Sequence, residues 1–596
     1  MIKSKCLQLI YVLFLLFFQF HSKAQTGNIA IGQWRTHSSF RNLALMAFDG
    51  NKIYASPSDK SFDSNIGTMF SVDKDGEIVK YGKENGLNEF GISQIGYSKS
   101  NNTLVVAYQN GLIDFISSDG RVNKLTAIKD KEITGLKSAN HLYFHKNVCF
   151  ISYDFGIIII NLLKFEITET ISSITNQQGS NIFKSTTIQK DTLFALSEKG
   201  LFKAAYNPQT NLMDVNNWEE IKNLPIDLKN ESLHLVSYNN NIYLSASRDG
   251  VYTLNSNRWE QIADLKGVGY IYNFLVSDDK LLLVSSSTIF AAFDGKNFQT
   301  LINSDNRGEL QNAILENNNT LWVATSTGLY KISGDLSQLE QQRKSQLIKF
   351  SSPYSNLAFK SFYNSYKDEL IVLAGGYSSS LGQRDIRKGY YIFKDGIWYN
   401  SEQIIINHNY KTEGQKDTTI EVGLLDIVDV TYDPAKDYYY FATYGWGLAS
   451  LNPRDSSYFL YYPENSTLQN SFNPGARGGI RVASLAIEDS KLWAISEKAP
   501  GGNITEPINT LKNGKWTRNN QFTNISALQT IIDSSGYKWF RNADYILNNF
   551  LALIFQCSFN CIFQTFKIIQ RMLTELRIGR ITIHPFFPPL VVMDTR

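Results

Sequence analysis

The chain has 596 residues, 43% of them apolar and 19% charged, so it is several times longer than one ordinary hydrophobic core requires. Lys and Arg number 58 against 55 Asp and Glu, and this nearly balanced net charge of +3 excludes the basic footprint of a nucleic-acid groove. A content of 32 Tyr, 37 Phe and 39 Gly beside 13 Pro favours short strands joined by tight turns over long helical bundles. We therefore expect an all-β chain of more than one domain, with no nucleic-acid partner.

Residues 1–24 have the pattern of a secretory signal peptide. Two lysines near the start precede the apolar run 7–20, and small residues follow as far as Ala24. We predict cleavage between Ala24 and Gln25. Because the apolar run is shorter than the ~20 residues that a transmembrane helix needs, we expect export through the inner membrane and no integral membrane span. A retained anchor is the alternative.

The body of the chain repeats one unit: a polar turn, a strand with alternating apolar residues, a turn containing Gly, and a second strand. Clear copies occupy residues 101–113, 240–252 and 319–330. The anchor positions in the first strand of each copy are Ile53, Leu104, Val148, Leu193, Ile242, Leu281, Leu321, Leu370, Tyr439, Leu492 and Trp539. Up to Leu321 their spacing averages about 45 residues, which is typical of a four-stranded propeller blade. The repeat therefore predicts β-propellers.

The anchors divide the chain into two propellers. Seven anchors precede residue 335 and four follow it, and the intervening residues 336–349 are polar, charged and free of Gly and Pro. We predict a complete seven-bladed propeller over 25–335, a linker over 336–349, and a second propeller, truncated at about four blades, over 350–542. Residues 31–34 are expected to supply the outer strand of the last blade of the first ring.

The tail, residues 543–596, breaks this pattern. It contains a single glycine, Gly579, and no rhythm of turns and strands. Loss of the reading frame or a disordered tail explains this change, and a natural membrane-associated segment is the alternative.

Candidate chemistry is sparse. His141 and His145 have the spacing of a helical metal pair, but the residues between them predict a strand, in which the two histidines would lie ~13 Å apart. Residues 73–77 resemble part of a calcium loop and are better explained as a hairpin turn. The sequence predicts no catalytic residue, no metal and no cofactor. Trp446 is the one candidate ligand-binding residue, because the glycines on both sides of it could expose the flat ring.

Four segments in order carry a resemblance to a known family. They are Gly82-Lys83-Glu84-Asn85-Gly86-Leu87, then Gly91-Ile92-Ser93-Gln94-Ile95-Gly96-Tyr97, the copy at 101–113, and Tyr153-Asp154-Phe155-Gly156 with the strand that follows. This combination resembles the N-terminal propeller family of PorZ, accessory proteins of the type IX secretion system of Bacteroidetes. The blade motif with Leu321-Trp322 and Gly328-Leu329 is similar to the more widespread two-component regulator propeller repeat.

The resemblance implies a non-catalytic binding and assembly protein with two seven-bladed propellers and a C-terminal β-sandwich. Such proteins bind anionic lipopolysaccharide and support the sortase step of secretion, in a complex with the sortase and an outer-membrane shuttle. The expected location is the periplasm or the outer-membrane cell surface. Because the sandwich that carries the family's export signal has no counterpart here, the sequence leaves surface delivery open. The alternatives are a secreted propeller enzyme acting on polysaccharide and the ectodomain of a two-component-type sensor.

Overall fold

The computed structural model describes residues 35–542, apart from 58–67, 177–180, 231, 256–257, 266–267, 293–296, 402, 411–417, 473–478, 499–501, 503, 521–526 and 534. The predicted signal peptide with its cleavage site between Ala24 and Gln25, residues 31–34 and the tail 543–596 lie outside the described residues. No described helix has the length and apolar character required to span a membrane. The chain divides into two compact units, a first unit of Thr36–Asn356 and a second unit of Arg35 with the described residues from Leu357 onward.

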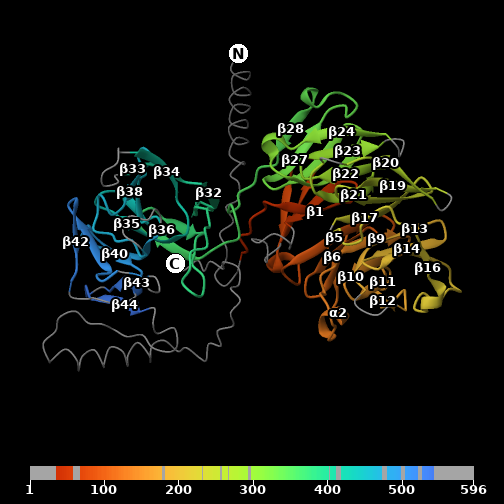
Figure 1. Cartoon of the computed structure of the whole chain (residues 1–596), viewed down its shortest axis with the longest axis horizontal. Helices are drawn as coiled ribbons and strands as arrows, with labels where there is room; N and C mark the ends of the chain where they lie inside the picture. Colours follow the sequence, from red (N-terminus) through yellow and green to blue (C-terminus); the bar gives the residue numbers. More distant parts are fainter. Residues whose placement is uncertain are drawn as a thin grey trace, which may run out of the picture. The chain divides into compact units, whose positions relative to one another are not determined.

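The described part of the first unit contains seven four-stranded antiparallel sheets, each built from consecutive strands (Figure 1). Sheet 1 is β1 (Leu43–Phe48), β2 (Lys52–Pro57), β3 (Met69–Asp73) and β4 (Ile78–Tyr81), and sheet 2 is β5 (Ile92–Ser98), β6 (Thr103–Tyr108), β7 (Ile113–Ser117) and β8 (Val122–Leu125). Sheet 3 is β9 (His141–His145), β10 (Val148–Tyr153), β11 (Gly156–Asn161) and β12 (Glu166–Ile171), and sheet 4 is β13 (Phe183–Gln189), β14 (Thr192–Ser197), β15 (Gly200–Ala205) and β16 (Glu219–Ile221).

Sheet 5 is β17 (Leu233–Tyr238), β18 (Asn241–Ala246), β19 (Gly250–Asn255) and β20 (Arg258–Ala263), and sheet 6 is β21 (Ile271–Ser277), β22 (Lys280–Ser285), β23 (Thr288–Ala292) and β24 (Phe298–Asn303). Sheet 7 is β25 (Leu310–Asn317), β26 (Thr320–Thr325), β27 (Gly328–Ser333) and β28 (Lys344–Leu347). Short helices in the connections are η1 (Lys83–Asn85), α2 (Ala127–Asp130), η2 (Val215–Asn217), η3 (Asp305–Arg307) and η4 (Glu340–Gln342).

The repeat found in the sequence corresponds to the second and third strands of each sheet. The anchor Leu321, for example, lies in β26, and a glycine opens the third strand of several sheets. Close packing requires that glycine: a Cβ on Gly156 would lie 2.6 Å from the carbonyl oxygen of Ile171, and one on Gly250 would lie 2.6 Å from that of Ala263. Each of these carbonyls belongs to the fourth strand of the same sheet. The repeat is therefore visible in the second and third strands, where close packing against the fourth strand limits which residues fit.

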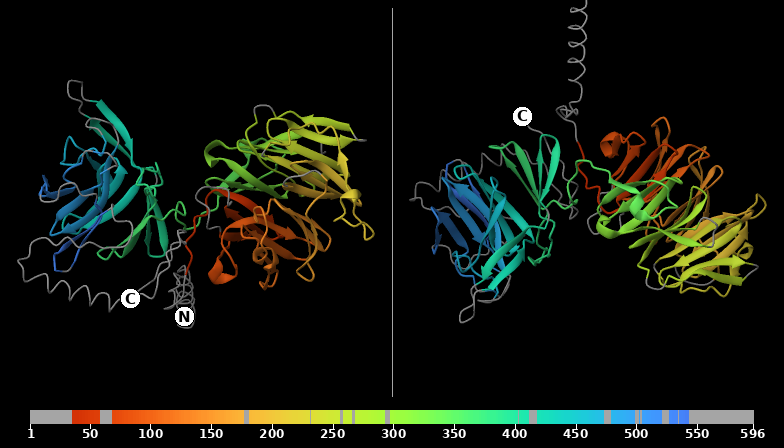
Figure 2. Two further views of the ribbon diagram at one scale, coloured as in Figure 1. Left: turned by 60° about the horizontal axis from the view of Figure 1, so that its bottom comes forward. Right: turned by 90° about the horizontal axis from the view of Figure 1, so that it is seen from above.

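The seven sheets form a closed ring. The first strands, among them β1, β5, β9, β17 and β21, lie near the middle of the unit, and Figure 2 shows the sheets following one another around it in chain order. Each first strand contacts the first strand of the next sheet, and β25 contacts β1. Seven separate hydrophobic clusters fill the seven interfaces between sheets. The closing cluster packs Leu43 and Phe70 of sheet 1 against Trp322 and Leu329 of sheet 7.

The structure differs from the predicted linker over 336–349. These residues include η4 and β28, and β28 pairs with β27 as the fourth strand of sheet 7. All four strands of this sheet lie within residues 310–347, and the unit extends to Asn356. Three of the four residues of β28 are exposed, so the strand lacks the alternation of apolar residues that marks a half-buried strand. This is why an outer strand has the composition of a linker.

The second unit continues the same pattern with four further sheets. Sheet 8 is β29 (Lys360–Asn364), β30 (Glu369–Leu373), β31 (Tyr390–Lys394) and β32 (Ile397–Ser401). A hairpin of β33 (Ile405–Tyr410) and β34 (Thr418–Gly423) follows and accounts for the long interval between the anchors Leu370 and Tyr439. Sheet 9 is β35 (Ile427–Asp433), β36 (Tyr438–Gly445), β37 (Leu448–Asn452) and β38 (Ser457–Tyr461), sheet 10 is β39 (Ile480–Glu488), β40 (Lys491–Ser496), β41 (Ile508–Lys512) and β42 (Lys515–Arg518), and sheet 11 is β43 (Ala527–Ile532) and β44 (Lys538–Asn542).

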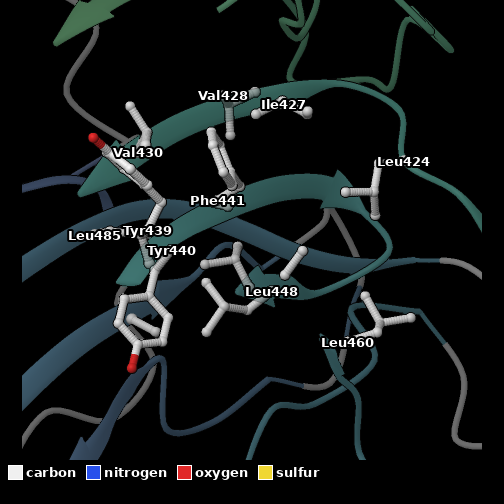
Figure 3. Close-up of a cluster of buried hydrophobic side chains, with 14 of the residues drawn as sticks. Leu424, Ile427, Val428, Val430, Tyr439, Tyr440, Phe441, Leu448, Leu460 and Leu485 are labelled. Carbon is white, nitrogen blue, oxygen red and sulfur yellow. The ribbon is translucent and has the colours of Figure 1, made fainter. Parts of the chain in front are cut away.

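One large hydrophobic cluster extends from sheet 8 through sheets 9 and 10 to Leu528 of sheet 11, and a smaller cluster around Trp493 and Phe540 joins sheets 10 and 11. β36 pairs with β39 through Tyr444 and Gly445, which joins sheets 9 and 10 into one eight-stranded sheet. Figure 3 shows buried side chains from β35, β36, β37 and β39 meeting here, among them Phe441 and Leu448. The predicted all-β propeller fold is confirmed.

Candidate functional site

One end of the second unit carries a network of buried polar and charged side chains. Three connections form it: residues 374–389 between β30 and β31, residues 445–447 between β36 and β37, and the described residues of 462–479 between β38 and β39. We call this region the loop end. Second-to-third and fourth-to-first connections of an antiparallel sheet emerge at the same end, so the topology brings these segments together.

Trp446 lies in the tight turn between β36 and β37. Its ring is half-buried and stacks on Tyr462, with ring centroids 6.3 Å apart and an interplanar angle of 25°. Its backbone N–H donates to Thr443 Oγ1 at 2.9 Å. Gly447 is required beside it, because its φ is +77° and a Cβ there would lie 2.5 Å from the carbonyl oxygen of Tyr461. One face of the indole is thus occupied by protein, and contact between Trp446 and a ligand stays a prediction.

A buried ion pair joins the segments of the loop end. Arg481 at the start of β39 is 4% exposed, and Glu497 directly after β40 is 0% exposed. Arg481 Nη1 donates to Glu497 Oε2 at 3.1 Å and to the carbonyl oxygen of Leu381 at 3.0 Å. The Tyr444 hydroxyl donates to the same carbonyl at 3.2 Å. Four chain segments therefore meet around one guanidinium group.

This ion pair is only partly satisfied by the described residues. Arg481 Nε and Glu497 Oε1 are buried without a described hydrogen-bond partner. The guanidinium instead lies between two rings, 4.9 Å from the centroid of Tyr444 and 4.6 Å from that of Phe472. Burial and the neighbouring Glu497 carboxylate raise the pKa of Tyr444, so its hydroxyl remains a neutral hydrogen-bond donor.

Asp426 holds the connection between β30 and β31 in place. Its buried carboxylate accepts the backbone N–H groups of Arg384 and Asp385 at 2.9 Å each and that of Ile386 at 3.0 Å. Burial raises the pKa of Asp426 although these three N–H groups favour the charged form. The fold thus fixes the backbone of a segment in which Arg384 and Arg387 are exposed. We call residues 376–389 the arginine loop.

A row of aromatic rings runs through the loop end. Phe359 meets Tyr377 edge to face at 5.0 Å between centroids, and Tyr377 meets Tyr444 at 4.9 Å. The row continues through Arg481 to Phe472. Its two ends reach the surface, because Phe359 is 37% and Phe472 is 42% exposed. The loop end can therefore offer flat apolar surface next to positive charge.

The first unit has a different polar system, built from neutral side chains on the innermost strands. Asn273 of β21 donates its Nδ2 to Asn312 Oδ1 of β25 at 3.0 Å, and Asn312 Nδ2 donates to the carbonyl oxygen of Ala44 in β1 at 2.7 Å. Gln94 of β5 donates to the carbonyl oxygen of Asn140 at 3.0 Å. These bonds tie sheet 6 to sheet 7, sheet 7 to sheet 1, and sheet 2 to the connection before sheet 3, which is a structural role.

The histidines and the possible calcium loop behave as hairpin and strand residues. His141 and His145 are the ends of strand β9, which confirms the predicted strand. Burial and the nearby His234 lower the pKa of His141 to about 4. Asp73 Oδ1 accepts the N–H groups of Asp75 at 3.0 Å and Glu77 at 2.8 Å, which closes the predicted hairpin between β3 and β4. No group of three metal-ligating side chains occurs among the described residues.

Sequence reasoning identified Trp446 but missed Asp426, Arg481 and Glu497. A signal was present, because each is a charged residue at the end of a strongly apolar stretch, where a charge is retained only if it has partners. The partners themselves come from segments up to about a hundred residues away, which no local pattern in the sequence identifies.

Comparisons with known proteins find one matching family model and several similar solved structures. Residues 64–219 match the family model described as the N-terminal β-propeller domain of PorZ of the type IX secretion system. A solved structure of PorZ from Porphyromonas gingivalis, described as an essential bacterial surface component of that system, superposes with a TM-score of 0.67 at 20% sequence identity. The superposition covers 85% of this chain and 63% of that one, so this chain spans less than two thirds of the length of PorZ.

Other solved structures are more distant. The extracellular domain of a hybrid two-component system of B. thetaiotaomicron has 15% identity and a TM-score of 0.38, covering 87% of this chain and 71% of that one. Virginiamycin B lyase of Staphylococcus aureus has 11% identity and a TM-score of 0.39, covering 50% of this chain and 98% of that one. A search of curated proteins finds no match. The chain is therefore similar to the PorZ N-terminal propeller in sequence over residues 64–219, and to PorZ in fold over most of its length.

Proposed function

We propose that this chain is a non-catalytic, exported binding protein of a type IX secretion system that recognises anionic lipopolysaccharide. The observation that carries the proposal is the match of residues 64–219 to the PorZ N-terminal propeller. The fold similarity to PorZ, a surface component of that system, supports it. Its place is the periplasm or the outer-membrane surface, and its protein partners are the sortase and the outer-membrane shuttle of the secretion complex.

The loop end of the second unit supports a binding role. Arg384 and Arg387 expose positive charge, Phe472 exposes aromatic surface on the same set of connections, and Phe359, directly before β29, exposes aromatic surface beside Arg384. Positive charge with apolar surface is the chemistry that an anionic saccharide requires, since guanidinium groups match phosphate and carboxylate and rings cover the apolar faces of sugars.

Binding to purified lipopolysaccharide tests the proposal. The chain from Gln25 onward would be immobilised and exposed to lipopolysaccharide that carries an anionic polysaccharide, and to lipopolysaccharide from the same strain without that polysaccharide. We expect saturable binding to the first preparation only. Absence of binding to the first, or equal binding to both, contradicts the proposal. Turnover of a glycan panel that one carboxylate substitution abolishes would instead favour a secreted enzyme acting on polysaccharide.

A further inference from the structure

We infer that the arginine loop of the second unit is the subsite for the charged group of an acidic saccharide, one that bears a phosphate or a carboxylate. The inference rests on the proposed function for the nature of the ligand, and it adds the place and the residues: Arg384 and Arg387, with Phe359 beside them.

The two arginines are available for a ligand. Both side chains are exposed, and neither guanidinium forms a hydrogen bond or an ion pair with any described residue. By contrast, other arginines of the second unit are engaged: Arg481 pairs with Glu497 and Arg518 pairs with Glu506. Two unpaired guanidinium groups three residues apart provide several N–H donors for the oxygens of one phosphate or carboxylate.

The backbone that carries these arginines is fixed before any ligand arrives. Besides the three N–H groups that Asp426 accepts, Gln383 donates its Nε2 to the carbonyl oxygen of Tyr444 at 2.8 Å. The carbonyl of Leu381 accepts from both Arg481 and Tyr444. Ser378 closes the loop tip, since its Oγ accepts the N–H of Gly382 at 2.8 Å. A loop held in this way loses little conformational entropy on binding, which favours affinity.

An aromatic ring lies next to the first arginine. A Cβ built on Gly376 would be 3.2 Å from Phe359 Cδ2 and 3.5 Å from Arg384 Nη1, so the ring and the guanidinium border the same small space. Glycine leaves that space open, and its φ of +147° disfavours any other residue. Phe359 is 37% exposed, and the ring of Tyr377 packs edge to face against it. A sugar ring over Phe359 would place its acidic substituent toward Arg384.

One acidic side chain moderates the site. Asp385 lies between the two arginines in sequence, and its carboxylate is exposed on the same loop. With Lys388, the loop carries three basic residues and one acidic residue, a net charge of 3 − 1 = +2. Removal of the Asp385 charge is therefore expected to strengthen binding, a result that a purely structural role of the loop does not predict.

The decisive experiment compares variants of the exported chain against two probes. The probes are lipopolysaccharide with an anionic polysaccharide, and a phosphorylated oligosaccharide prepared with its dephosphorylated form. For Arg384→Ala with Arg387→Ala we expect binding of both acidic probes to weaken by roughly tenfold or more, because each charged hydrogen bond contributes about that factor. Phe359→Ala is expected to weaken binding several-fold, and Asp385→Asn to strengthen it about two- to threefold at low salt.

Arg454→Ala is the matched control. Arg454 is an exposed arginine of the same unit, in the turn between β37 and β38 at the other end of sheet 9, and its substitution should leave binding unchanged. Thermal unfolding of each variant checks that the fold is retained, as expected for exposed side chains.

The outcomes separate the inference from the proposed function. If the parent chain binds anionic lipopolysaccharide and the double arginine variant binds it equally well, the subsite is wrong and the proposed function stands. If the parent chain binds only the phosphorylated oligosaccharide, and the double variant loses it, the subsite stands and the proposed function fails. If the parent chain binds neither acidic probe, both are overturned.

Discussion

The two units share one architecture but stabilise it with different chemistry. Among the described residues of the first unit only Asp114 is a buried charged side chain, and its partners, Tyr108 and Asn88, are neutral. The described residues of the second unit bury six: Glu369, Asp426, Asp429, Asp433, Arg481 and Glu497. A buried charge costs several kcal/mol unless its partners are well placed. Three of the six, Asp426, Arg481 and Glu497, lie at the loop end, where they hold its connections together.

The hydrophobic cores of the two units also differ. The first unit divides its apolar side chains into seven clusters, one for each interface of a closed ring. In the described part of the second unit, one large cluster extends from sheet 8 to Leu528 of sheet 11, and a smaller one fills the interface between sheets 10 and 11. Neutral amides are sufficient to align the sheets of the ring, whereas the second unit uses charged groups to hold long connections. The proposed binding site thus lies in the unit whose long connections are held by charged groups.

Among the substitutions that test this contrast, Arg481→Ala is expected to have the largest effect on stability. It leaves the Glu497 carboxylate buried without its cation, and we expect the second unit to lose about 3–5 kcal/mol of unfolding free energy. Chemical denaturation followed by tryptophan fluorescence measures the loss, and Arg454→Ala is the exposed control. The double change Arg481→Met with Glu497→Leu should recover most of the stability. An Arg481→Ala variant as stable as Arg454→Ala would show that the ion pair does not hold the loop end.

A smaller effect is expected for Asn312→Ala in the first unit. The change removes the partner of Asn273 and of the Ala44 carbonyl where the ring closes, and unpairing these groups costs about 2–3 kcal/mol. Asn319→Ala, in an exposed turn of the same sheet, should change stability by less than about 0.5 kcal/mol. Equal stability of the two variants in urea denaturation would refute the role of the amide ties.

Acidification should change the stability of the two units in opposite directions, through His141 in the first unit and Asp426 in the second. The pKa of His141 in the folded first unit is about 4, below the 6.5 of an exposed histidine, so the neutral form is favoured by folding. This contribution is present above pH 6.5 and is lost as the pH falls toward 4, by roughly 1–2 kcal/mol once partial exposure is allowed for. Asp426 in the second unit has the opposite sign, because its raised pKa favours the protonated folded form at low pH.

Stability measured between pH 7 and pH 4 tests this assignment. The first unit of a His141→Gln variant should lose less stability over this range than the parent. If both lose the same amount, His141 is not the responsible group.

The smallest expected effect concerns Trp446. Since its ring is half-buried against Tyr462, Trp446→Ala should weaken binding of anionic lipopolysaccharide only about two- to fivefold, and Trp446→Phe less. Trp516→Ala is a matched control, because Trp516 is also half-buried and packs edge to face on Tyr461 at 5.4 Å. Equal binding by the Trp446 and Trp516 variants would remove Trp446 from the site.

The sequence predicted the fold where the chain is locally constrained. The anchors and the following glycines mark the second and third strands, since a buried strand and a glycine forced by a close carbonyl leave a periodic trace. The sequence did not predict strand β28, because most of its residues are exposed to solvent and polar, like those of a linker. It singled out Trp446 from its flanking glycines, although the ring is half-buried, and Asp426 and Arg481 gain their roles only when distant connections fold onto them.

The closure of the first ring has a mechanical consequence. Its two chain ends are not joined by a shared strand within the described residues, but by short-range contacts: the Ser39 N–H donates to Asn356 Oδ1 at 2.7 Å, the Ser39 hydroxyl donates to the Tyr354 carbonyl at 2.9 Å, and Phe40 packs on Phe350 at 5.1 Å. A pulling force applied to the two ends would therefore act first on these contacts and on the interface between sheets 7 and 1. The ring should open at the interface between sheets 7 and 1, while the other six interfaces remain intact.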